Sequence, residues 1–128
     1  MMPVPLSLLA LHFVGDFVLQ TDWMALNKSR HLDALTLHVA VYTSVFAGWL
    51  YFPVPSVPDA VNISQFLVFT FLSHLLTDAI TSRMTARLWF IDASGALVPG
   101  RRHWFFVTIG ADQLIHAATL AFAAQRWL

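Results

Sequence analysis

The chain has 128 residues, of which 58% are hydrophobic and only 11% are charged, and its mean hydropathy is +0.67. A soluble domain cannot bury so much apolar surface, so the composition predicts an integral membrane protein. The seven basic and seven acidic residues balance, which leaves no basic surface for nucleic acid, and the lack of cysteine excludes disulfides and thiolate metal ligands.

Four apolar stretches are long enough to cross a membrane as helices. In chain order they are residues 4–20, 35–52, 63–82 and 104–127. The predicted fold is therefore all-α, a polytopic membrane protein in which a bundle of four transmembrane helices forms a single domain over residues 1–128. The five tryptophans all lie near the ends of these stretches. This is typical of side chains that anchor helices at the two membrane interfaces.

The basic residues outside the stretches fall in alternate loops. Cytoplasmic loops carry an excess of lysine and arginine, so we expect the first and third loops in the cytoplasm and both termini outside, in a bacterial inner membrane. Polar residues between Gln20 and Lys28 would form a cytoplasmic rim, where they either cap helices or orient a head group. The basic residues are Lys28 and Arg30 in the first loop, and Arg83, Arg87, Arg101 and Arg102 in or beside the third.

Three of the four stretches carry one histidine and one aspartate four residues apart, a spacing that places both side chains on one helix face. The pairs are His12 with Asp16, His74 with Asp78, and Asp112 with His116, and the second stretch adds His38. The last helix runs opposite to the first and third, so its reversed order also puts the aspartate nearer the cytoplasm. At ~1.5 Å per residue all seven groups lie in the cytoplasmic half of the bundle. We expect them to converge in one pocket.

Aspartates inside a bilayer cost about 2.5–3.5 kcal/mol each on insertion scales, and no lysine or arginine lies at their depth in the predicted spans. Protonated aspartates, protonated histidines or a bound cation would relieve this cost. Two divalent ions would balance three carboxylates and one bridging hydroxide. Histidine and aspartate suit Zn²⁺ or Mn²⁺, and also Fe²⁺. The predicted ligands of one or two such ions are His12, Asp16, His38, His74, Asp78, Asp112 and His116.

Several motifs in the chain resemble one known family. The resemblance rests on residues 12–25 (HFVGDFVLQTDWMA), on residues 37–43 (LHVAVYT), on residues 74–78 (HLLTD) with Ser82 and Arg83, and on residues 112–116 (DQLIH). The family consists of small inner-membrane proteins of bacteria and phages, is catalogued as a domain of unknown function, and is related by name to membrane-bound metal-dependent hydrolases. The resemblance implies four membrane helices with the His/Asp set as the site, and it implies no substrate.

The first functional hypothesis is a membrane-embedded, divalent-metal-dependent hydrolase that acts from the cytoplasmic side on a phosphoester or lipid-like substrate. The catalytic candidates are Asp16, Asp78 and Asp112, because one that does not bind metal is free to act as general base. Two alternatives use the same residues: a transporter or channel for metal ions or protons, and a non-catalytic membrane subunit whose polar cluster fixes helix register. Membrane lipids are the expected partners, nucleic acid is not, and the sequence predicts no oligomeric state.

Overall fold

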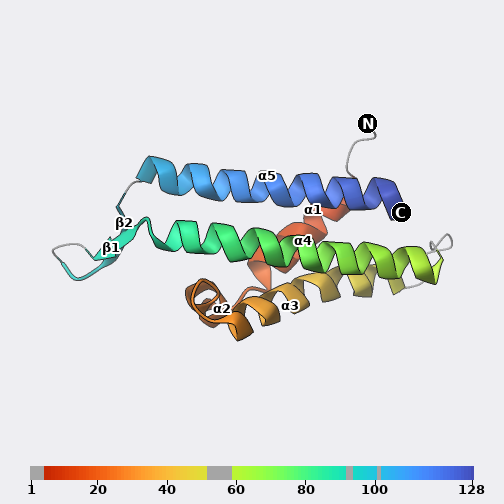
Figure 1. Ribbon diagram of the computed structural model, residues 1–128, viewed down its shortest axis with the longest axis horizontal. Coiled ribbons are helices and arrows are strands. Elements are labelled where there is room, and N and C mark those ends of the chain that lie inside the picture. The colour runs from red at the N-terminus through yellow and green to blue at the C-terminus, as the bar shows by residue number, and fades with distance from the viewer. Residues whose placement is uncertain (1–4, 52–58, 92–93, 101) are drawn as a thin grey trace.

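The computed structural model describes residues 5–51, 59–91, 94–100 and 102–128. Three long helices form most of it, α3 (Leu32–Tyr51), α4 (Ala60–Ala86) and α5 (Arg102–Trp127), and α4 packs against both of the others (Figure 1). With 20, 27 and 26 residues, they are about 30, 40 and 39 Å long at ~1.5 Å per residue. All three are long and apolar enough to cross a bilayer. The predicted helical fold is confirmed, and it is consistent with a membrane location.

The segment predicted as the first span is shorter than expected. It consists of α1 (Leu6–Phe13) and a π-helical turn, η1 (Val14–Val18), which have 8 and 5 residues and together cover only about 20 Å. The helix stops there because Thr21 adopts an extended backbone and its hydroxyl caps the next helix, α2 (Asp22–Asn27), by accepting a hydrogen bond from the Met24 amide. In the described residues, three helices rather than four are long enough to span a membrane alone.

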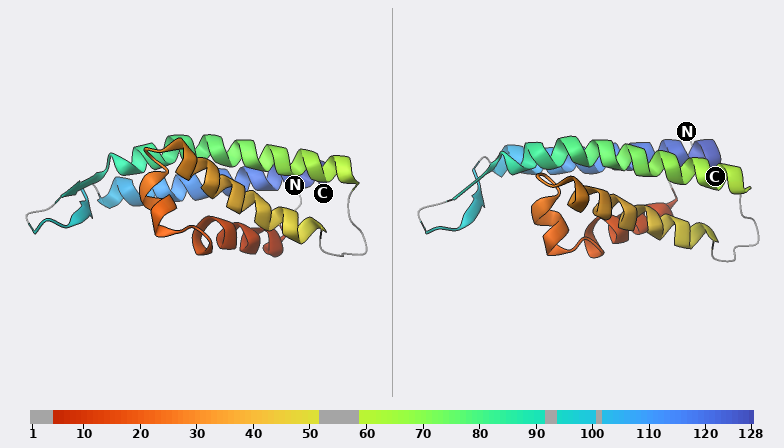
Figure 2. Two further views of the ribbon diagram at one scale, coloured as in Figure 1. Left: turned by 90° about the horizontal axis from the view of Figure 1, so that it is seen from below. Right: turned by 60° about the horizontal axis from the view of Figure 1, so that its bottom comes forward.

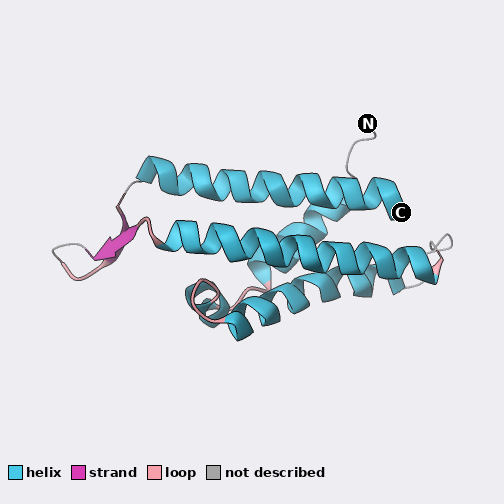
Figure 3. Cartoon of the chain, viewed as in Figure 1, coloured by secondary structure: helices cyan, strands magenta, loops and turns pink. Residues whose placement is uncertain are grey.

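The helices alternate in direction, so both ends of the bundle are well defined. The start of α1, the end of α3 and the end of α5 lie at one end of the bundle, whereas α2 and the connection from α4 to α5 lie at the other (Figure 2). That connection contains a short antiparallel hairpin of β1 (Trp89–Ile91) and β2 (Leu97–Pro99), drawn in magenta in Figure 3. The hairpin is a small addition to an otherwise helical fold, and Gly95 supports its turn with a positive φ of 83°.

The basic residues that the structure describes gather at the end with α2 and the hairpin. Lys28 and Arg30 lie between α2 and α3, Arg83 and Arg87 lie at the end of α4, and Arg102 begins α5; Arg126 is the exception at the opposite end. The basic loops predicted from the sequence therefore share one end of the bundle. Arg101, and residues 52–58 of the loop predicted to face outward, lie outside the described residues.

The opposite half of the bundle is filled by apolar side chains. Large apolar residues also face outward along the long helices, for example Leu72 and Leu76 on α4 and Leu114 on α5. Such a surface suits contact with lipid tails, where helices associate through close packing rather than through exclusion from water. The buried apolar side chains inside this half of the bundle form a cluster that we call the apolar core. It consists of Leu8, Tyr42, Phe46, Leu50, Ile63, Phe66, Leu120 and Ala123.

Candidate metal centre

The structure brings all seven of the predicted site residues together, and we call them the His/Asp cluster. Six of the seven side chains are buried, and Asp112 is partly buried. Their ligand atoms form three overlapping groups, and within each group the atoms lie within 4.8 Å of one another. The groups are Asp16, His38, His74 and Asp78; His12, Asp16 and His116; and Asp78, Asp112 and His116. Three residues each belong to two of these groups: Asp16, Asp78 and His116.

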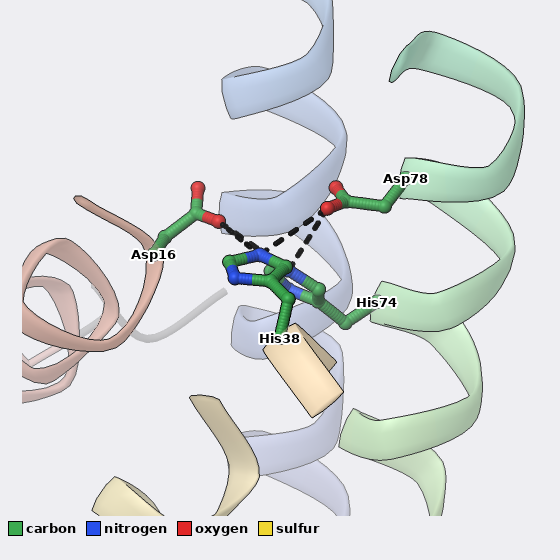
Figure 4. A group of neighbouring side chains, drawn as sticks. All are labelled: Asp16, His38, His74 and Asp78. Atoms are coloured by element: carbon green, nitrogen blue, oxygen red, sulfur yellow. Dashed lines mark hydrogen bonds and ion pairs between the residues drawn. The ribbon is translucent and has the colours of Figure 1, made fainter. Parts of the chain in front are cut away.

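The first of these groups, which we call the central group, is compact (Figure 4). The Nε2 atom of His38 lies 3.2 Å from Asp16 Oδ1, 3.2 Å from Asp78 Oδ2 and 3.2 Å from the Nε2 atom of His74. His74 Nε2 lies 3.4 Å from Asp16 Oδ1 and 3.7 Å from Asp78 Oδ2. Ligands that surround one ion tetrahedrally at ~2.0–2.1 Å are about 3.3 Å apart. These five separations, of 3.2–3.7 Å, match those that a four-coordinate ion requires between its ligands.

Several ring nitrogens in the cluster have no hydrogen-bond partner among the described residues. These buried atoms are His38 Nδ1, His74 Nδ1 and both nitrogens of His116. His116 Nε2 lies 3.4 Å from Asp78 Oδ1, and its Nδ1 lies 3.6 Å from Asp112 Oδ2. Nearly all buried polar atoms in proteins are hydrogen-bonded. A cation between His116 and these carboxylates would satisfy one of the His116 nitrogens, whereas His38 Nδ1 and His74 Nδ1 are not the ring nitrogens that face the carboxylates of the cluster.

Ring stacking fixes the orientation of the imidazoles. The rings of His74 and His116 are stacked with centroids 4.0 Å apart and an interplanar angle of 7°, and the Tyr42 ring lies 3.8 Å from His74 on the side of the apolar core. Rings held by packing present their nitrogens in a fixed direction, which lowers the entropic cost of binding an ion. The stacked rings tie α3, α4 and α5 together at the site.

Gln113 is a site residue that the sequence analysis did not select. Its side-chain amide nitrogen donates to Asp16 Oδ2 at 2.9 Å and to Asp112 Oδ2 at 3.0 Å, so its oxygen faces His12 Nε2 at 2.9 Å. The carboxylates only accept, so the amide nitrogen faces them and the amide oxygen accepts from His12 Nε2; the Tyr42 hydroxyl lies 3.0 Å from His12 Nδ1. His12 would have to release Gln113 before it could bind a metal. The only signal for Gln113 was its place beside Asp112.

Lys28 also reaches the cluster, contrary to the expectation that no basic side chain would be available. Its Nζ atom donates to Asp78 Oδ2 at 2.9 Å, and its side chain is 18% exposed whereas that of Asp78 is 2% exposed. The expectation was wrong because the chain after α2 folds back over the site instead of staying at the rim. Asp78 Oδ2 therefore faces both His38 and Lys28.

A cavity of about 490 Å³ lies beside the cluster on the side of α2 and the hairpin. Asp16, Asp78, Asp112 and Gln113 line its polar part, and it also has apolar lining residues from α2, β1 and α5. The apolar core lies on the other side of the cluster. The cavity therefore extends from the His/Asp cluster toward the basic end of the bundle, where Lys28 and Arg30 also line it.

A family model described as "Protein of unknown function (DUF3307)" matches residues 4–128. The chain belongs to the DUF3307 family. The match covers every helix of the DUF3307 chain described above and the whole His/Asp cluster, and the family description assigns no activity. No curated protein and no solved structure matches the chain.

Gly15 allows η1 to pack directly on α3, and its replacement tests whether this contact positions Asp16. A Cβ atom at Gly15 would lie 2.9 Å from Tyr42 Cδ2 and 3.3 Å from Tyr42 Cα. Gly15→Ala should therefore force η1 away from α3, destabilise the protein by about 1–3 kcal/mol and weaken metal retention. Thermal unfolding and metal content would be measured in detergent. The control is Gly48→Ala, because a Cβ there meets nothing within 4 Å; equal behaviour of the two variants would contradict the prediction.

Proposed function

We propose that the protein is a membrane-embedded hydrolase that depends on a divalent metal and acts on a phosphoester or lipid-like substrate. The observation that carries the proposal is the central group, in which each of two imidazole nitrogens lies 3.2–3.7 Å from two carboxylate oxygens beside a cavity. Two nitrogen and two oxygen ligands in this arrangement suit Zn²⁺ best and Mn²⁺ next. A second ion would use His116 with Asp78 and Asp112. A metal bound there would polarise the scissile bond and acidify a water molecule.

When a single ion occupies the central group, Asp112 is not one of its ligands and has the properties of a general base. Its side chain is 16% exposed and lines the cavity, whereas those of Asp16 and Asp78 are 4% and 2% exposed. Gln113 holds Asp112 Oδ2, and the Thr81 hydroxyl lies 2.6 Å from Oδ1. An oriented carboxylate that water can reach is able to take a proton from the attacking water.

The placement of the cluster favours hydrolysis over transport. A transporter needs polar groups on both sides of its binding site. Here the buried side chains that the structure describes beyond the cluster belong mainly to the apolar core, and the Thr43 and Thr70 hydroxyls are buried there without a hydrogen-bond partner among the described residues. A site that is open to one side fits an enzyme that takes up its substrate and releases its products through the same opening. The basic end of the bundle supports an orientation with this opening in the cytoplasm and both termini outside a bacterial inner membrane.

The test is to measure metal content and turnover on the same purified full-length protein. We expect at least one equivalent of Zn²⁺ or Mn²⁺ per chain after reconstitution. Hydrolysis of bis(p-nitrophenyl) phosphate or a short-chain lipid phosphoester should stop with a chelator and return with metal. Metal-loaded protein that hydrolyses neither substrate class but moves ions into proteoliposomes would favour the transporter. Protein that binds no metal would favour the non-catalytic subunit.

A further inference from the structure

The cavity beside the His/Asp cluster combines a basic group, unpaired polar atoms and an apolar wall. We propose that it binds a membrane lipid with a phosphate-type anionic head group, and that Lys28 binds this head group. The inference rests on the proposed function, since it names the substrate class of the same site. Three independent features of the cavity lining support it.

The first feature is the position of Lys28, which lines the cavity and donates to Asp78 Oδ2 at 2.9 Å. That oxygen also belongs to the central group, so a metal ion bound there would compete with the ammonium group for it. Two cations on one carboxylate oxygen repel each other, and the lysine side chain is long, flexible and partly exposed. Metal binding would therefore release the ammonium group into the cavity, where an oxyanion is its natural partner.

The second feature is a pair of polar atoms that lack partners. Gln20 Oε1 and Ser82 Oγ are buried without a hydrogen bond among the described residues, and both residues line the cavity. The neighbouring Thr85 hydroxyl, by contrast, donates to the backbone carbonyl of Thr81 in its own helix. Buried polar atoms are usually satisfied. A head group would satisfy both atoms, because its oxyanion accepts from the Ser82 hydroxyl and a hydroxyl on it donates to Gln20.

The third feature is the apolar wall. Leu26 from α2, Trp89 from β1, and Phe105 and Ile109 from α5 line the cavity, and the Trp89 ring packs edge-on against Phe105 with centroids 5.1 Å apart. Cavities of ~300–1,000 Å³ bind small organic ligands, so about 490 Å³ is large enough for a head group and part of an acyl chain. A free phosphate or a small sugar phosphate would leave this wall without a partner. The wall therefore favours a lipid over a soluble phosphate compound.

The test uses probes whose carbon–phosphorus bond cannot be hydrolysed, so it measures binding alone. Zn²⁺-loaded full-length protein in phosphatidylcholine nanodiscs would be titrated calorimetrically with dodecylphosphonate, methylphosphonate and dodecanol, with empty nanodiscs subtracted. Dodecylphosphonate should bind at least about tenfold more tightly than either of the other probes, as expected if the oxyanion and the chain each contribute. Lys28→Gln should weaken it about tenfold, while Lys28→Arg should restore binding. Arg126→Gln, which removes one positive charge at the opposite end of the bundle, is the matched control and should change nothing.

Each contrary result would overturn a defined part of the inference. Equal affinity in wild type and Lys28→Gln would remove Lys28 from the head-group site. Methylphosphonate binding as tight as that of dodecylphosphonate would identify a soluble phosphate ligand, and equally tight dodecanol binding would identify an apolar ligand without an anion. Lys28-dependent binding of dodecylphosphonate in a protein without any turnover would refute the hydrolase and leave this lipid site standing. Turnover with no dependence of binding on Lys28 would refute only the lipid site.

Discussion

Asp78→Asn is expected to weaken metal binding more than about 100-fold, because it removes a carboxylate that two of the groups share. The loss of a hydrogen bond to a metal ligand alone costs about 10–100-fold. Asp78 Oδ2 faces His38 and His74, and Asp78 Oδ1 faces His116 at 3.4 Å. The same carboxylate therefore belongs to two of the three groups that are able to hold an ion. The measurement is metal content by atomic spectroscopy after dialysis against graded chelator concentrations.

The matched control for Asp78 is Asp33→Asn, the same chemical change at an exposed aspartate in the first turn of α3. This variant should keep its metal. The Asp78 variant should still insert and fold, since removing a buried carboxylate eases insertion into a bilayer. Metal content that is equal in the wild type and in Asp78→Asn would show that the central group does not bind the ion.

Asp112→Asn is expected to lower hydrolysis by about 100-fold or more while the central group keeps its ion, because removal of a general base typically costs 10²–10⁴ in rate. Asp112 is not a member of the central group, and its asparagine variant keeps the shape that Gln113 and Thr81 contact. The two substitutions should therefore separate metal binding from turnover. Single-turnover rates and metal content would be measured on the same samples.

Two outcomes would contradict the role given to Asp112. If Asp112→Asn loses all metal, the residue is an essential ligand, and the general base must be sought elsewhere in the cavity. If hydrolysis is unchanged, Asp112 has no part in the reaction. Thr81→Val provides a graded comparison, because it removes only the hydroxyl that lies 2.6 Å from Asp112 Oδ1; its effect on turnover should be smaller than that of Asp112→Asn.

The members of the cluster could be predicted because the helix period determines which residues share a helix face. His74 and Asp78 are four residues apart on one helix, so any helical structure puts them on the same face, and the reversed order of Asp112 and His116 matches the reversed direction of α5. A face that carries both an imidazole and a carboxylate in three helices has no stable place against lipid. The convergence of these faces follows from the sequence pattern alone. The roles of the residues as ligands or catalysts are predictions that the experiments above test.

The remaining contacts depend on features that periodicity does not encode. Lys28 pairs with Asp78 because the turn after α2 directs it back to the bundle, and the two residues are 50 positions apart in the chain. The link from Gln113 to His12 spans 101 positions. The sequence also did not predict that the first helix ends early, since Val14, Phe17 and Val18 are equally compatible with an α-helix or a π-helical turn. Side-chain partners across such distances are set by tertiary packing and not by local spacing.

The short first segment has a consequence for the bilayer around the protein. In a bilayer, a segment of about 20 Å beside two helices of about 40 Å would create a hydrophobic mismatch. Lipids adapt to a short apolar segment by thinning the bilayer locally, which draws head groups and water inward. The thinned side would lie at η1, which carries Asp16, and at the turn that leads to α2. This local deformation would move lipid phosphates toward the centre of the bilayer, to the level of the buried carboxylates.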